Sequence, residues 1–197
     1  MFKSFNLEFT KTNKQASFTL IELLVVIAVL AILMGAIVIT LNPQEMLKKG
    51  RDAKRISELK SINTALGIYQ ANKPTISMGN ASTTYVSIPA INSNCSDLGL
   101  PTPPSSYSYS CSTSANYKKT DGTGWIPVNF NSLDIGSPLF TLPTDPTNST
   151  STGLYYTYTT GGSWELTSTL ESNIYKMGGD NDRASKDGGI YPELYEV

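Results

Sequence analysis

Histidine occurs nowhere among the 197 residues. Its absence excludes Ser-His-Asp and Cys-His nucleophile arrangements and every zinc site that needs an imidazole ligand. Cysteine is scarce as well, because Cys95 and Cys111 are the only two, too few for a Cys-only zinc site. A phosphate-binding glycine loop is also missing. The sequence therefore predicts a protein that is not an enzyme and has no organic cofactor; a membrane-anchored enzyme that uses carboxylates is the weaker alternative.

Charged side chains are few, at 16% of the chain, and they are unevenly distributed. Residues 1–60 carry nine Lys/Arg and five Asp/Glu, whereas residues 61–197 carry six and eleven. The larger part of the chain is therefore acidic and has no basic footprint for nucleic acid. We expect no specific nucleic-acid partner.

One long apolar run stands near the N-terminus, from Phe18 to Leu41. As a helix these 24 residues would span about 36 Å, enough to cross a bilayer with some tilt. A secretory signal has a shorter apolar core and an A-x-A-like cleavage site after it, and no such site follows here. We expect a leader at residues 1–17 and a retained transmembrane helix at residues 18–41, in contact with membrane lipid.

Glu22 interrupts this apolar run. A carboxylate in a membrane segment is costly and marks a functional hypothesis that needs a partner. The local alternative is a capping box, because Thr19-Leu-Ile-Glu22 matches the S/T-x-x-E pattern of a helix start. The spacing leaves both interpretations open.

The ten residues from Ser17 to Val26, SFTLIELLVV, resemble the N-terminal cleavage and methylation motif of type IV pilins and type II secretion pseudopilins. The resemblance implies that a prepilin peptidase cuts between Ser17 and Phe18 and methylates the new Phe18 amine. Ser17 stands where the family usually has glycine. Glu22 becomes the fifth mature residue, and its carboxylate can pair with the Phe18 amine of a neighbouring subunit.

The same resemblance implies a function and partners. The chain would be a structural subunit of a type II secretion pseudopilus or a type IV pilus-like filament, most similar to a major pseudopilin. It would assemble with copies of itself and other pseudopilins, and would need an assembly platform protein and an assembly ATPase. The alternative is a membrane-anchored surface-binding module or minor pilin for adhesion or DNA uptake.

The orientation of the segment in the membrane has two readings. The motif requires a cytoplasmic leader, which makes the chain a single-pass inner or cytoplasmic membrane protein with an extracytoplasmic C-terminal domain. After assembly the filament would be periplasmic or at the cell surface. The basic residues just after the apolar run, Lys48 to Arg55, point the other way, because positive charges favour the cytoplasmic side.

Residues 42–73 predict an amphipathic helical stem. Asn42 can serve as the N-cap and Pro43 can occupy the first turn, while Lys73-Pro74 ends the helix. Apolar residues recur at three- and four-residue steps and need a sheet to pack against. This stripe consists of Ala53, Ile56, Leu59, Ile62, Leu66 and Tyr69. The polar face, which we expect to meet solvent, consists of Arg51, Lys54, Arg55, Glu58 and Lys60.

Residues 74–197 predict a polar, β-rich domain, so the fold class is α+β: a pilin-like long helix packed on a small antiparallel sheet. The clearest hairpin runs from Leu154 to Leu170 around a Gly161-Gly162 turn, and Trp125 to Phe130 favour an edge element. The hairpin tyrosines favour core packing over a carbohydrate-stacking surface. Tyr107 to Cys111 alternate as a strand does.

Two sets of site residues remain in this domain. Cys95 and Cys111 favour a single disulfide if the domain is exported, with two reduced thiols as the alternative. Major pseudopilins commonly bind calcium in a C-terminal loop, and the resemblance suggests Asp180, Asp182 and Asp187 as ligands. The local alternative for this glycine-rich segment is a solvated turn.

Overall fold

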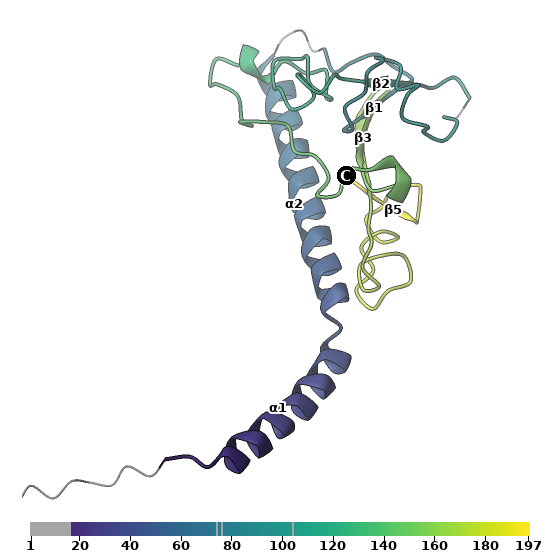
Figure 1. The fold of residues 1–197 in the computed structure, drawn as a ribbon. Helices are drawn as coiled ribbons and strands as arrows, with labels where there is room; N and C mark the ends of the chain where they lie inside the picture. Colours follow the sequence, from purple (N-terminus) through teal and green to yellow (C-terminus); the bar gives the residue numbers. More distant parts are fainter. Residues whose placement is uncertain (1–16, 74, 76, 104) are drawn as a thin grey trace, which may run out of the picture. The chain divides into compact units, whose positions relative to one another are not determined.

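The computed structural model describes residues 17–73, 75, 77–103 and 105–197 (Figure 1). The predicted leader therefore lies outside the described residues, apart from Ser17. The described chain forms two compact units that divide between Pro43 and Gln44. Each unit is described by itself below.

The first unit consists chiefly of the helix α1, Leu20–Leu41. Thr19 is its N-cap, and Asn42 is its C-cap in the left-handed conformation with φ 41°. Asn42 also directly precedes Pro43, the first residue of the second helix, and its predicted role as N-cap of that helix stays a prediction. Residues 20–38 have a mean hydropathy of 3.0, and α1 is long and apolar enough to cross a membrane.

The stem is α2, Pro43–Asn72, a helix of 30 residues that ends where the sequence predicted. Leu59, Ile62 and Leu66 are fully buried and Tyr69 nearly so, which places the predicted apolar stripe against the rest of the domain. Ala53 is exposed, contrary to the prediction. At that end of the helix, Asp52 and Arg55 are buried instead.

The second unit also contains a sheet of five strands in the order β2-β1-β3-β4-β5. Its β1 and β2 pair in parallel, while the other three pairs are antiparallel, so the predicted antiparallel sheet is correct except at one edge. The α+β class is confirmed. The strands are β1 (Thr83–Val86), β2 (Ser108–Cys111), β3 (Tyr156–Thr160), β4 (Trp164–Thr169) and β5 (Leu194–Glu196).

The predicted hairpin is β3 and β4. Thr160 is opposite Trp164, so the connection has three residues rather than the predicted Gly-Gly pair alone. The Gly161 N–H donates to the Ser163 carbonyl at 2.9 Å, and Gly162 has φ 93°, a conformation that side chains rarely adopt. The glycines identified the turn, and Ser163 completes it.

One face of the sheet packs towards α2, and we call it the inner face; Figure 1 shows α2 beside the sheet. The Tyr156 hydroxyl donates to Glu58 at 2.6 Å, and the Trp164 indole donates to Asn63 at 2.8 Å, both residues of α2. Tyr156, Tyr158 and Leu166 are fully buried in this core. The hairpin tyrosines on the inner face therefore pack in the core, as predicted.

Residues 125–130 do not form the edge strand that their apolar pattern suggested. They run as an irregular segment that leads into a short 3-10 helix, Phe130–Ser132. Trp125, Ile126, Val128 and Phe130 are at most 1% exposed and belong to the inner core. Pro127 lacks the N–H that a strand ladder needs, so the segment contributes side chains to the core without joining the sheet.

Candidate functional site

The Ser17–Phe18 peptide bond lies in a non-helical segment directly before the N-cap Thr19, whose own backbone is extended. Ser17 is exposed, and the Phe18 side chain is 89% exposed. A protease must reach the scissile carbonyl along an open backbone, which a helix would close off. The start of α1 at Leu20 therefore leaves this bond accessible to a processing enzyme.

Glu22 forms a complete capping box with Thr19. The Glu22 carboxylate accepts hydrogen bonds from the Thr19 N–H at 2.9 Å and from the Thr19 hydroxyl at 2.8 Å. In return, the Thr19 hydroxyl oxygen accepts from the Glu22 N–H at 3.3 Å. The local alternative from the sequence is therefore present in the structure. The capping box also holds the Glu22 carboxylate against Thr19, the residue next to Phe18, whose amine would be created by cleavage.

The rest of α1 presents an apolar surface. Every described side chain of this helix is exposed, including Leu24, Ile27 and Leu33, each at least 54%. An exposed apolar surface of this length needs a partner, which is either lipid or other apolar helices. The helix thus combines an accessible bond, one carboxylate and a surface for membrane or helix contact.

A buried cluster of ions ties α2 to the sheet domain, and the sequence analysis missed it. Arg55 is fully buried rather than on the solvent face. Its guanidinium donates to Asp145 at 2.5 and 3.0 Å, to Asp52 at 2.8 Å and to Glu171 at 2.7 Å. We call Asp52, Arg55, Asp145 and Glu171 the stem cluster; Arg51 joins its edge through two hydrogen bonds to Glu171.

The electrostatics of the stem cluster follow from these contacts. Burial acts to lower the pKa of Arg55, but hydrogen bonds to Asp145 and Glu171 outweigh it and raise the pKa above its ordinary value. Hydrogen bonds from Arg51, and then from Arg55, lower the pKa of Glu171 to about 2. Asp52 also accepts the N–H groups of Glu171 and Ser172. Arg55 and Glu171 are therefore both ionised at neutral pH, and the cluster fixes two loops to the stem.

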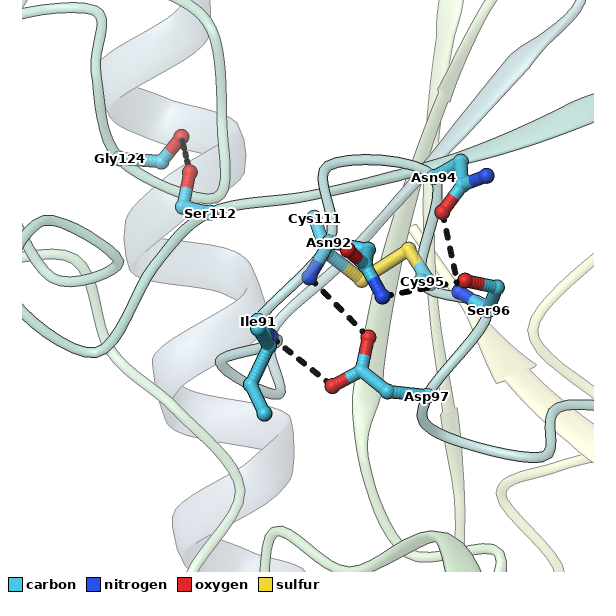
Figure 2. The surroundings of a disulfide bond; sticks show 9 residues. All are labelled: Ile91, Asn92, Asn94, Cys95, Ser96, Asp97, Cys111, Ser112 and Gly124. Carbon is cyan, nitrogen blue, oxygen red and sulfur yellow. Dashed lines mark hydrogen bonds between the residues drawn. A yellow bond between two sulfur atoms is a disulfide. The ribbon is translucent and has the colours of Figure 1, made fainter.

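Cys95 and Cys111 are joined by a disulfide (Figure 2). Beside the disulfide, the Asp97 carboxylate accepts hydrogen bonds from the N–H groups of Ile91 and Asn92 at 2.9 and 3.2 Å. A small second core surrounds the bond, formed by Val86, Ile88, Ala90 and the two half-cystines. The disulfide thus pins a loop that has few apolar side chains of its own.

Asp180, Asp182 and Asp187 do not come together as a ligand set. Asp182 instead organises its own turn: it accepts the N–H of Gly178 at 2.8 Å and both the N–H and the hydroxyl of Ser185 at 2.9 and 2.6 Å. The Ser185 hydroxyl, followed by these N–H groups, lowers the pKa of Asp182 to about 2. Among the residues that the structure describes, no three His, Cys, Asp or Glu side chains are placed to hold a metal.

Comparison with known proteins identifies one family model. Residues 12–38 match the model described as "Prokaryotic N-terminal methylation motif". The match includes the Ser17–Phe18 bond, the Thr19–Glu22 capping box and most of α1. No curated protein and no solved structure shows significant similarity to the chain.

Proposed function

We propose that this chain, a type IV pilin-like protein with a prepilin-type N-terminus, is a structural subunit of a type II secretion pseudopilus or of a type IV pilus-like filament. The motif at residues 12–38 supports a pilin-like subunit of the kind that prepilin peptidase processes. Pilin-like proteins are structural rather than enzymatic. The observation that carries the proposal is the accessible Ser17–Phe18 bond directly before an apolar helix.

Assembly follows from what α1 exposes. In the membrane its apolar surface is covered by lipid, and in a filament the same surface is covered by the corresponding helices of other subunits. Transfer from lipid to filament removes the subunit from the bilayer and so needs an external energy source. A platform membrane protein and an assembly ATPase supply that step in this proposal.

Glu22 sets the register of an incoming subunit in this scheme. Cleavage creates a cationic amine at Phe18, and the Glu22 carboxylate of a second subunit pairs with it where screening by water is weak. Only the correct register pairs the amine with the carboxylate and so leaves neither charge unpaired. The capping box satisfies the carboxylate in the single chain, so pairing replaces an intrachain contact with an intersubunit one.

The orientation belongs to the same proposal. We place residues 1–17 in the cytoplasm and the sheet domain outside, where an oxidising compartment preserves the Cys95–Cys111 disulfide. The basic residues after α1 oppose this orientation in a simple charge count. In the folded domain two of them, Arg51 and Arg55, are paired with acidic side chains.

Mass spectrometry of the mature N-terminus tests the proposal. Co-expression with a prepilin peptidase should yield a chain that begins at N-methylated Phe18, while a catalytically inactive peptidase leaves the precursor intact. Ser17→Gly, which restores the residue usual in the family, should be cut at least as well. A chain that keeps Met1 in the presence of active peptidase, or that is cut after Leu41, would contradict the proposal.

A further inference from the structure

The strand register sorts the sheet residues into the inner face and an outer face that points away from α2. Tyr85, Tyr158 and Leu166 are cross-strand neighbours on the inner face. Their strand neighbours alternate to the outer face, where Thr84 lies opposite Thr159, and Thr157 opposite Thr167. The outer face therefore carries a ladder of threonine hydroxyls across the centre of the sheet.

This outer face is hollowed into a groove with a volume of about 320 Å³. The lining consists of five threonines, four tyrosines, Gly153, Leu194 and a single carboxylic acid, Glu165. The volume lies at the lower end of the range for ligand pockets, about 300–1,000 Å³. The tyrosines are Tyr107, Tyr109, Tyr155 and Tyr191.

Two of these rings are held in place by the disulfide loop. Tyr109 and Tyr155 pack against the second core, which contains Cys95 and Cys111. Burial raises the pKa of both hydroxyls, and at Tyr155 the charge of Tyr109 raises it further. Their rings are thus fixed before any ligand arrives, which lowers the entropic cost of binding.

The chemistry of the lining selects among ligands. Among the residues that the structure describes, no lysine or arginine lines the groove, so a phosphate, a nucleic acid or an acidic sugar would find no opposite charge in this lining. Hydroxyl groups dominate; Thr157 and Thr167 share a hydrogen bond at 2.7 Å, and each threonine oxygen keeps a further lone pair. Tyrosine rings offer flat apolar surface next to these polar groups. A neutral polyhydroxyl compound matches every part of this lining.

We propose that the outer-face groove binds a neutral oligosaccharide. Tyr109 and Tyr155 stack against sugar rings, while the threonine hydroxyls and the Glu165 carboxyl exchange hydrogen bonds with sugar hydroxyls. This binding site lies beyond the proposed filament function and does not depend on it. It would let a subunit contact a glycan surface while α1 serves assembly.

Calorimetric titration of the full chain in a zwitterionic, sugar-free detergent tests the site. Maltohexaose, cellohexaose and chitohexaose are the probes, each titrated to several millimolar. Saturable binding of at least one supports the proposal. No binding of any of the three overturns it, because the groove is then only a solvated sheet face, as many antiparallel sheets have. Binding of hexalysine without sugar binding also overturns it, since the acidic residues near Glu165 would then be the site.

Matched variants place the binding in the groove. Thr167→Val keeps shape and removes one hydroxyl, so the sugar Kd should rise about three- to tenfold. Tyr155→Phe keeps the ring and should change the Kd less than Tyr155→Ala, which removes the stacking surface. Thr64→Val on the exposed face of α2 is the control and should leave the Kd unchanged.

Near-UV circular dichroism of each variant verifies that the domain is folded, because Tyr155 also supports the second core. Wild-type affinity in both folded Thr167→Val and folded Tyr155→Ala would overturn the proposal. The measurement uses single chains in detergent, so its failure leaves the filament function untouched, and failed N-terminal processing leaves this result untouched.

Discussion

Arg55 and Asp145 form a buried, two-bonded ion pair across 90 residues of sequence: Arg55 Nε donates to Asp145 Oδ2 at 2.5 Å and Nη2 donates to Oδ1 at 3.0 Å. Arg55 is fully buried and Asp145 is 3% exposed. The pair fixes the loop before β3 to the stem helix. Because both charges are out of water, each depends on the other for its solvation.

Removal of the guanidinium should therefore be severe. Arg55→Leu leaves Asp52 and Asp145 buried without their counter-charge, and we expect a loss of about 3–5 kcal/mol in the free energy of unfolding. The stability of Arg55→Lys should fall between those of the wild type and Arg55→Leu, because an ammonium cannot make the forked contact. Urea denaturation followed by near-UV circular dichroism measures the loss. Lys60→Leu, at an exposed position of α2, is the control; an equal effect there would refute the role of the cluster.

The acid sensitivity of the domain should reflect Glu171. Its pKa in the folded chain is about 2, below the ordinary value of 4.5, so the unfolded state binds the proton first as pH falls. The stabilisation is present above about pH 4.5 and is lost between there and pH 2. The contribution of Glu171 should thus be constant above about pH 4.5 and should make the unfolding temperature drop below it.

Glu171→Gln should reduce the drop in unfolding temperature at acid pH, and it should lower the unfolding temperature at neutral pH. Asp182, whose pKa is also about 2, titrates in the same window, so Asp182→Asn is the companion variant. If the drop in unfolding temperature at acid pH is unchanged in Glu171→Gln, the salt link from Arg51 and Arg55 does not control acid stability.

The charge of Glu22 and its capping contact can be separated. Glu22→Gln keeps an oxygen for the Thr19 N–H and hydroxyl but removes the negative charge, whereas Thr19→Ala keeps the charge and removes the hydroxyl partner. We expect both to be cleaved at Phe18, with filament yield abolished in Glu22→Gln and only reduced in Thr19→Ala. Sheared filaments are quantified at equal membrane abundance. The reverse order would mean that helix capping, not charge pairing, is what assembly requires.

The disulfide should stabilise the β1–β2 side of the sheet. It closes a loop across a sequence separation of 16 residues, for which the chain-entropy estimate is about 3 kcal/mol. Replacement of both cysteines by serine should lower the unfolding temperature and expose residues 88–100 to limited proteolysis. Peptide mapping locates the cuts. Cuts confined to other segments would show that this loop is held by its hydrogen bonds alone.

Calcium should not stabilise the C-terminal loop. Asp182 already accepts three hydrogen bonds within its turn, and a cation would have to displace those donors. We expect the unfolding temperature to be the same in millimolar calcium and in excess chelator. A rise with calcium that is absent in Asp182→Asn would restore the metal site that the family resemblance suggests.

Local patterns sufficed for some elements and not for others. The apolar run that became α1, the three- and four-residue spacing of α2 and the alternation around Gly161 each reflect interactions between near neighbours in sequence. Arg55 was placed on the solvent face because an isolated arginine on a helix normally is solvated. Two of its three acidic partners lie 90 and 116 residues away, and no spacing rule reaches them.

Two other errors have the same origin. Trp125 to Phe130 are apolar enough for an edge element, but whether they fill the core or join the sheet depends on the space that the inner face leaves open. The three-residue strand β5 is too short for any periodic signal, and it pairs with β4 through tertiary contacts. The Ser17–Phe18 bond and Glu22 were visible because the motif that contains them is contiguous.

The stem cluster also imposes an order on biogenesis. Arg55 is synthesised early, yet two of its three acidic partners, Asp145 and Glu171, lie in the last third of the chain. Until the ribosome has delivered them, the stem carries a guanidinium that has no interior to enter. A subunit terminated before Asp145 would keep that defect permanently, so a chain that lacks its last quarter carries a buried-charge defect in its stem before it can enter a polymer.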